Sequence, residues 1–212
     1  MSLPLPHVRR VKLPKPMSDV GAKADIGLTG LTWLITWKNE ILSAPTLETD
    51  RLRLRAYKNE DFEQFANFYS SPRSRFADGP VSRSTAWAWF AAGAGRWPLV
   101  GYGAWAVDRL VDQMCVGVVS LNHPIKHSEE RELGWLLWET YEGYGYAIEA
   151  ASEAKKFAFD ELKWSTLVSY IAIDNRRSID LAQRMGASLD NDATHLADIH
   201  TMVYRHHPPR DY

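Results

Sequence analysis

Two glycines separate a strand-like segment from a helix-like segment in the second half of the chain. Residues 132–138 (ELGWLLW) predict the strand, Gly143 and Gly145 lie in the turn, and residues 145–162 predict the helix. Glycine lets the backbone approach a ligand closely, and the first N–H groups of a helix point outward at the positive end of its dipole. The pattern is typical of a phosphate or pyrophosphate site. A tight strand-to-helix connection explains the same residues equally well.

Two familiar phosphate-binding fingerprints do not match this turn. The third glycine of a dinucleotide fingerprint would fall at Ile148, and no Gly-Lys-Ser/Thr follows as in a P-loop. A second polar cluster, residues 174–178 (DNRRS), follows another predicted strand. Asn175 is a favourable helix N-cap, which can account for this cluster by itself. The two clusters together, with a long helix between them, are more specific than either alone.

The surrounding pattern predicts an α+β domain. Residues 51–55 alternate strictly between arginine and leucine, which indicates a half-buried strand. Helices are expected over about 59–69, 82–93, 145–162 and 175–185, and strands over 101–108, 115–122, 132–138, 166–173 and 199–204. Alanines dominate an apolar stripe on the helix 145–162, so this helix should cover one face of a sheet.

Composition excludes several classes of protein. The chain has 212 residues, enough for one substantial core, and its 25 Lys and Arg against 26 Asp and Glu argue against a nucleic-acid binder that relies on bulk positive charge. A single cysteine, Cys115, excludes an intramolecular disulfide framework. No apolar run approaches the roughly 18 residues that span a bilayer, so we expect a soluble, cytoplasmic protein without a membrane partner.

The motifs in their order resemble the GNAT superfamily of acetyl-CoA-dependent N-acetyltransferases, in particular its ribosomal-protein-alanine-acetyltransferase-like branch. The resemblance covers roughly residues 45–204. It rests on the segments 45–55 (PTLETDRLRLR), 132–135 (ELGW), 143–150 (GYGYAIEA), 175–178 (NRRS) and 185–187 (MGA). One position departs from the family pattern, because Glu142 stands where the pyrophosphate loop commonly begins with Gln or Arg. We interpret Glu142 as pointing to solvent, so that backbone N–H groups supply most of the cradle.

The resemblance implies a three-layer fold in which helices flank a mixed, mostly antiparallel sheet that splays between the strands 132–138 and 166–173. Pantetheine would enter that gap and pair with the backbone around Leu136 and Leu137. Asn175 would anchor the pantetheine arm through its amide. The pyrophosphate would be held by the turn residues Gly143, Tyr144, Gly145, Tyr146 and Ala147.

The reaction that the resemblance implies is acetyl transfer from acetyl-CoA to a primary amine. An alkyl amine has a pKa near 10, so removing its proton at neutral pH costs roughly 4 kcal/mol. Glu132 is the candidate base, directly or through water, although an exposed strand glutamate in a surface ion pair is the competing interpretation. Ser178 is the candidate proton donor for the thiolate, or equally a local helix cap. A noncatalytic acyl-CoA-binding regulatory module is the alternative function.

Other candidate sites are weaker. The histidines lack the spacing of a metal site, so we expect no metal, and Cys115 reads as a buried thiol. Trp87, Trp89 and Trp97 either line the acceptor pocket or pack in the core. The acceptor is expected to be a small-molecule amine or a protein N-terminus.

The predicted domain covers residues 45–212, after an N-terminal extension or leader over residues 1–44 that contains four prolines. We expect a monomer or a homodimer.

Overall fold

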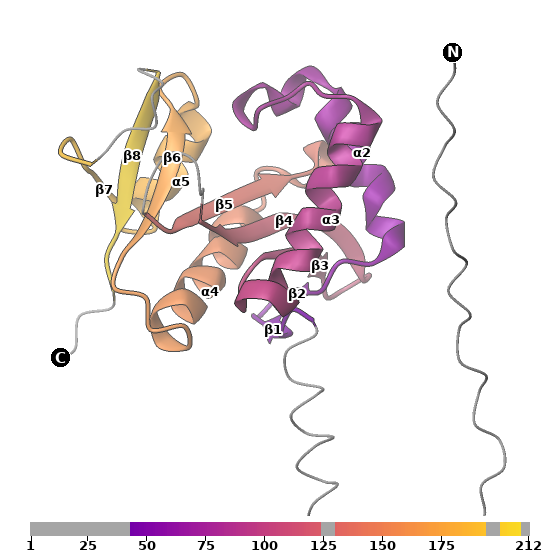
Figure 1. Cartoon of the computed structure of the whole chain (residues 1–212), viewed down its shortest axis with the longest axis horizontal. Helices are drawn as coiled ribbons and strands as arrows, with labels where there is room; N and C mark the ends of the chain where they lie inside the picture. Colours follow the sequence, from indigo (N-terminus) through magenta and orange to yellow (C-terminus); the bar gives the residue numbers. More distant parts are fainter. Residues whose placement is uncertain (1–42, 124–129, 194–199, 209–212) are drawn as a thin grey trace, which may run out of the picture. The chain divides into compact units, whose positions relative to one another are not determined.

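The fold is built on an eight-stranded sheet (Figure 1). The computed structural model describes residues 43–123, 130–193 and 200–208. The strands are β1 (Leu47–Glu48), β2 (Leu52–Arg55), β3 (Ala104–Arg109), β4 (Met114–Asn122), β5 (Glu132–Leu137), β6 (Leu167–Ala172), β7 (Ser188–Leu189) and β8 (Thr201–His206). Their order in the sheet is β1-β2-β3-β4-β5-β6-β8-β7, and β5 with β6 is the parallel pair among otherwise antiparallel neighbours.

Helices cover both faces of this sheet. They are α2 (Phe62–Ser70), α3 (Arg83–Val100), α4 (Tyr146–Asp160) and α5 (Arg176–Arg184), with short 3-10 turns η1 (Asn59–Asp61), η2 (Pro72–Phe76) and η3 (Glu139–Tyr141). The expected α+β class and the mixed, mostly antiparallel sheet flanked by helices are confirmed.

The alternation of side chains along each strand divides the core into two layers. On β3, Ala104 and Ala106 face a cluster that includes α2 and α3, whereas Trp105 and Val107 face the cluster that contains α4. The alanine stripe of α4 is buried as predicted, with Ala150, Ala151, Ala154 and Ala158 packed against the sheet. Small side chains let a helix approach a sheet closely, so this helix is held in place by packing.

The sheet splays between β5 and β6. Their ladder contains one pair, Glu132 with Val168, and the Val168 N–H donates to the Arg131 carbonyl at 2.8 Å. Figure 1 shows β6 and β8 turning away from β4 and β5 beyond this point. The expected splay is therefore present, and it opens towards the carboxyl end of β5.

The second helix differs from the prediction, because α3 extends to Val100 instead of ending near Gly93. The helix continues through Gly93. This glycine allows a close approach to β3, since an added Cβ would lie 3.2 Å from that of Ala104. Trp97 then anchors the last turns by burying its indole, whose Nε1 donates to the Ala104 carbonyl at 2.9 Å. Tertiary packing thus extends a helix that the local glycines argued against.

A buried ion-pair cluster ties the first strands together. Arg55 on β2 donates from Nε to Asp108 Oδ2 at 2.6 Å and from Nη1 to Asp61 Oδ2 at 2.7 Å. Both aspartates are buried, and their hydrogen bonds raise the pKa of Arg55 although burial opposes that rise. Each charge therefore depends on its partner, because an unpaired buried charge is costly.

The predicted N-terminal extension lies almost wholly outside the described residues, so its boundary at residue 44 stays a prediction. At that position Ala44 is already buried, and the Pro45 carbonyl accepts a hydrogen bond from Trp105 Nε1 at 2.8 Å. None of the described helices is both long enough and apolar enough to cross a bilayer.

Candidate active site

The free edge of β5 is the first component of the site. Residues 132, 134, 136 and 138 direct their backbone groups to β4, as the bond from the Trp138 N–H to the Val116 carbonyl at 3.0 Å shows. The alternate residues, Trp135 and Leu137, therefore direct theirs into the gap beside β6. Beyond the single β5–β6 pair, no strand among the described residues pairs with these groups. An extended ligand can add to this edge as a strand would.

This register corrects one predicted contact and keeps another. The backbone of Leu136 belongs to the ladder with Val118 of β4, so it is not available to a ligand in the gap. The backbone of Leu137 does face the gap, as does that of Trp135, which the sequence prediction did not include. A shift of one residue along a strand reverses the direction of every backbone and side-chain group, and the motif alone does not give the register.

A buried hydroxyl closes the narrow end of the gap. Ser169 on β6 donates from Oγ to the Leu133 carbonyl at 2.7 Å, and its oxygen lies 2.9 Å from His206 Nε2. Because the single hydroxyl proton is used on Leu133, the imidazole must donate to Ser169. Burial lowers the pKa of His206 to about 4, with smaller contributions from nearby Lys155 and His207, so the imidazole is neutral and this bridge is uncharged.

The glycine turn has the backbone conformation that the sequence predicted. Gly143 has φ of 84° and Gly145 has φ of 82°, both in the left-handed region that favours glycine. Gly145 is the N-cap residue of α4, and it has no side chain to satisfy the first N–H groups of the helix. The N–H groups of Tyr146 and Ala147 therefore point out of the helix end next to a turn with open space around Gly143. These are the properties of an anion cradle.

Arg51, the residue before β2, braces this turn. Its guanidinium donates to the Tyr144 carbonyl at 3.0 Å, pairs with Glu149 at 2.5 Å and lies over the ring of Tyr146. The Tyr146 side chain is buried, whereas Tyr144 is 60% exposed. Any contact from Tyr146 to a ligand is therefore made by its backbone, and Tyr144 can offer its ring as well.

Glu142 does not point freely into solvent, so that interpretation was wrong. Its side chain is one-third exposed, and its carboxylate pairs with Arg73 of η2 and, at 2.5 Å, with Arg177 of α5. The two guanidinium groups neutralise the carboxylate that the sequence placed at the start of the loop. The repulsion expected for a pyrophosphate is thus offset by partners from distant parts of the chain.

Asn175 and Ser178 lie at the start of α5. The Asn175 Oδ1 accepts from the Ser178 N–H at 3.3 Å, so Asn175 is the helix N-cap. This bond leaves the Asn175 amide NH₂ group free for other contacts. The Ser178 hydroxyl is not the cap, and Ser178 is not among the residues that line the cavity around Glu132. Its assignment as the proton donor stays a prediction.

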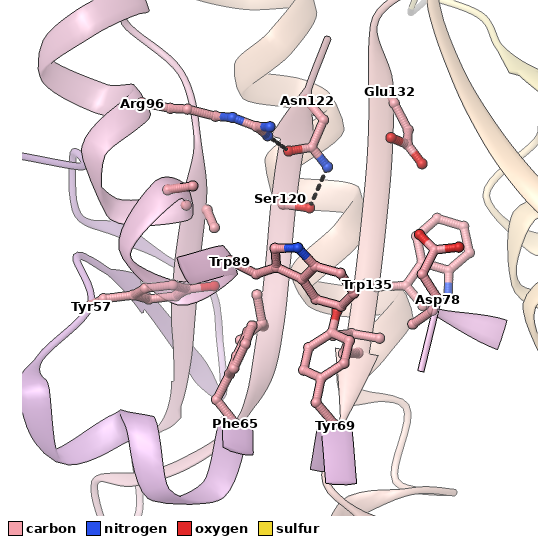
Figure 2. Close-up of a pocket in the computed structure, with 16 residues that line it drawn as sticks. Tyr57, Phe65, Tyr69, Asp78, Trp89, Arg96, Ser120, Asn122, Glu132 and Trp135 are labelled. Atoms are coloured by element: carbon pink, nitrogen blue, oxygen red, sulfur yellow. Dashed lines mark hydrogen bonds between the residues drawn. The ribbon is translucent and has the colours of Figure 1, made fainter. Parts of the chain in front are cut away.

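A cavity of about 290 Å³ lies beside β5 on the face covered by α2 and α3. Figure 2 shows aromatic rings around its lower part and polar side chains at its upper edge. The rings belong to Tyr57, Phe65, Tyr69, Trp89 and Trp135, and the charged groups are Asp78, Arg96 and Glu132. An aromatic wall with a few polar groups is typical of a small-molecule site.

Glu132 contributes its carboxyl to this cavity from the first position of β5. Burial raises its pKa to about 7; the Asn122 amide, which donates to the carboxylate, opposes the rise, whereas the negative charge of Asp78 adds to it. Arg96 opposes the rise through its positive charge. A carboxylate with a pKa near neutrality can both accept and release a proton at physiological pH.

The amide of Asn122 organises the polar edge of the cavity. It accepts from Arg96 at Oδ1 and donates from Nδ2 to Ser120 Oγ at 3.0 Å (Figure 2). The hairpin register places Asn122 directly opposite Glu132. Asn122, Arg96 and Asp78 were missed in the sequence analysis. Asn122 could have been found, because a hairpin of the two predicted strands places it opposite Glu132.

The three tryptophans predicted for the acceptor wall have different positions. Trp89 lines the cavity, and Trp87 is 46% exposed and packs on Phe62 outside it. Trp97 is buried in the opposite core layer against Trp105, so of the two alternatives it packs in the core. Cys115 is a buried thiol as expected, and burial raises its pKa to about 11. Among the described residues no cluster of His, Cys, Asp and Glu could hold a metal ion.

Comparison with known proteins decides the family. The family model described as acetyltransferase (GNAT) domain matches residues 51–188, which is more than half of the chain. The chain belongs to the GNAT acetyltransferase family. The matched region contains β5, the glycine turn and α5, so the expected family is confirmed on the elements that form the site.

Solved structures of other GNAT proteins are similar to this chain. An acetyltransferase from Agrobacterium tumefaciens strain C58 is 40% identical over 80% of this chain and 98% of its own, with a TM-score of 0.74. A Vibrio cholerae protein provisionally named a ribosomal-protein-serine acetyltransferase is 21% identical over 77% of this chain and 98% of its own, with a TM-score of 0.60. The V. cholerae spermidine N-acetyltransferase, solved with CoA and spermine, is 16% identical over 74% of this chain and 94% of its own, with a TM-score of 0.58. The last two share the fold.

Proposed function

We propose that this GNAT protein transfers the acetyl group of acetyl-CoA to a primary amine. The observation that carries the proposal is the double role of β5. The strand offers the free backbone of Trp135 and Leu137 to the gap beside β6, and it directs the Glu132 carboxyl into the neighbouring cavity. A thioester along the edge of β5 would lie next to a base and an acceptor pocket.

The residues of the gap fit the chemistry of acetyl-CoA, which supplies an activated acetyl thioester. The N–H groups of Tyr146 and Ala147 and the turn at Gly143 and Gly145 hold the pyrophosphate. Trp135 and Leu137 pair with the pantetheine amides through their backbones. The Asn175 amide NH₂ donates to the same arm while its Oδ1 remains the helix cap.

Glu132 acts as the base, directly or through one water molecule. Its pKa of about 7 is low enough for the carboxylate to be present at neutral pH and high enough for it to accept a proton from an amine. Starting from an ammonium ion, the acceptor nitrogen loses two protons as the N–C bond forms and the C–S bond breaks. One proton leaves through Glu132 to solvent, and the other ends on the CoA sulfur.

The backbone of β5 and the α5 terminus supply the remaining functions. The Trp135 N–H, which faces the gap, donates toward the acyl oxygen where negative charge develops. Ser178, at the start of α5, passes its hydroxyl proton to the sulfur and takes the second proton of the nitrogen in return. Because two substrates are held side by side, positioning contributes part of the rate independently of either side chain.

The proposal is tested by combining titration calorimetry of acetyl-CoA with a free-thiol release assay over a panel of primary amines. We expect acetyl-CoA to bind and thiol release to depend on the amine. Tight binding without thiol release from any amine would favour a noncatalytic acyl-CoA-binding module. Absence of binding would refute both functions.

A further inference from the structure

The cavity carries opposite charges at two ends. Arg96 projects from α3 to one side of Asn122 and Glu132 lies on the other side, whereas Asp78 lies below Glu132 beside Trp135 (Figure 2). The groups come from α3, from β5 and from the segment between η2 and α3, which the fold brings together around one space. A ligand that fits this arrangement needs a positive group at one end and a negative group at the other.

Two of these charges lack an ion-pair partner within the described part of the chain. Arg96 donates to the neutral amide of Asn122, and Asp78 makes no salt bridge there. Eight other described arginines and eleven other described acidic side chains take part in ion pairs, such as the pair of Arg73 with Glu142. Asp78 also has φ of 61°, a backbone conformation uncommon outside glycine and often found at functional sites. Both charges are therefore available to a ligand.

Asn122 sets the spacing between the two ends. It accepts from Arg96 at Oδ1 and lies directly opposite Glu132 in the register of β4 with β5, so its amide lies between the guanidinium and the base (Figure 2). An α-amino acid places its ammonium nitrogen about 3 Å from its carboxylate oxygens, and a hydrogen bond of about 3 Å at each end extends its reach to about the span of an amide hydrogen-bonded on both sides. Such a unit can lie alongside Asn122, with its ammonium at Glu132 and Asp78 and its carboxylate at Arg96.

The remaining walls select the side chain of the ligand. Tyr57 stacks on Phe90 at 4.4 Å between ring centroids, and Trp89 contacts Tyr69 edge-to-face at 5.1 Å, so the rings are held by their own packing. Phe65, Trp89 and Trp135 line the same space. A cavity of about 290 Å³ with these walls suits one aromatic or large aliphatic group.

We propose that the acceptor is a free α-amino acid with an aromatic or large apolar side chain, whose carboxylate is bound by Arg96 and whose amino group lies between Glu132 and Asp78. This inference rests on the proposed acetyltransferase function and names its acceptor class. The nitrogen of the amino acid forms the new bond to the acetyl carbon, the C–S bond breaks, and the product is an N-acetyl amino acid with free CoA thiol.

The same charges disfavour two other acceptor classes. A polyamine would place a second ammonium group near the Arg96 guanidinium, which repels it. The N-terminus of a peptide offers a neutral carbonyl in place of the carboxylate, so Arg96 would keep an uncompensated charge. Both classes are therefore expected to react more slowly than the free amino acid.

The test compares four acceptors that share the benzyl group with two that lack it. Thiol release is measured with L-phenylalanine, L-phenylalaninamide, phenethylamine, a peptide with N-terminal phenylalanine, L-alanine and spermidine. We expect kcat/KM for L-phenylalanine to exceed that for the acceptors without a free α-carboxylate by about tenfold or more, since a charge-assisted hydrogen bond is worth at least this factor. L-alanine keeps the carboxylate but should also react about tenfold more slowly, since it buries no large apolar side chain. Quenching of tryptophan fluorescence by L-phenylalanine in the presence of CoA measures binding independently of turnover.

Arg96→Gln supplies the second arm, and Arg83→Gln on the same helix is the matched control, because Arg83 pairs with Glu63 outside the cavity. We expect the preference for L-phenylalanine over phenethylamine to fall about tenfold in Arg96→Gln and to stay unchanged in Arg83→Gln. If phenethylamine, spermidine or the peptide is the preferred acceptor of the wild-type protein, this inference is overturned while the acetyltransferase function stands. If no amine gives thiol release, the proposed acetyltransferase function itself is overturned. If Arg96→Gln does not fold, the acceptor panel with the wild-type protein still decides between the acceptor classes.

Discussion

Replacing Glu132 by glutamine should slow the enzyme and stabilise the protein at alkaline pH. The folded state raises the pKa of this carboxyl from 4.5 to about 7, mainly because burial disfavours its charged form. The folded protein therefore binds this proton more tightly than the unfolded chain does. The stability that the neutral carboxyl contributes is fully present below about pH 4.5 and is lost as the pH rises through about 7.

The size of the effect follows from the same pKa values. At 1.36 kcal/mol per pKa unit, ionising this partly buried carboxyl costs about 3 kcal/mol at high pH. Between about pH 5 and about pH 8.5 the wild-type protein should thus lose about 2–3 kcal/mol of unfolding free energy that Glu132→Gln retains. Glutamine keeps the size of the side chain and a side-chain oxygen that can accept a hydrogen bond. Glu60→Gln, at an exposed position of η1, is the control that should show no such difference.

Urea unfolding of the three proteins at both pH values measures the stability difference, and steady-state thiol release across the same range measures catalysis. We expect turnover of Glu132→Gln to fall by about 100-fold or more and to lose the rise through about pH 7 that wild type shows. A wild-type pH profile in Glu132→Gln would remove Glu132 as the base. Equal stability differences at the two pH values would show that its carboxyl is not desolvated in the folded state.

Three further substitutions test the cradle and the core. Gly143→Ala should cost about 1 kcal/mol and weaken CoA binding through backbone strain alone, because nothing lies within 4 Å of an added Cβ; thermal unfolding and calorimetry measure both, and wild-type values would contradict the left-handed turn. Asn175→Asp keeps the helix cap but removes the amide donor, so CoA affinity should fall about fivefold at unchanged thermal stability, and unchanged affinity would count against the pantetheine contact. Arg55→Gln leaves Asp61 and Asp108 buried without their partner, so urea unfolding should show a loss of about 3–5 kcal/mol; a loss under about 1 kcal/mol would mean that water reaches the cluster.

The sequence predicted the features that depend on neighbouring residues. The alternation in residues 51–55 identified the strand that buries Leu52 and Leu54, and the left-handed conformations of Gly143 and Gly145 followed from the need for glycine in the turn. The alanine stripe of α4 predicted the face that packs on the sheet. Each of these follows from the period of a helix or strand or from the backbone freedom of one residue type.

The tertiary structure decided what depends on residues distant in the sequence. The register of β5 on β4 placed Trp135, and not Leu136, at the free edge of the gap. Glu142 pairs with Arg73 and Arg177, which local sequence could not indicate because each comes from a different element.

The acceptor cavity shows the same division. Glu132 was identifiable from its motif, but its pKa and its neighbours Asp78, Arg96 and Asn122 were not. Desolvation and Coulomb interactions act over a few ångströms in space, whatever the separation along the chain. The sequence therefore determined the family and the strand that carries the chemistry, whereas only the packing of α3 and the η2–α3 segment against β5 decided which charges an acceptor meets.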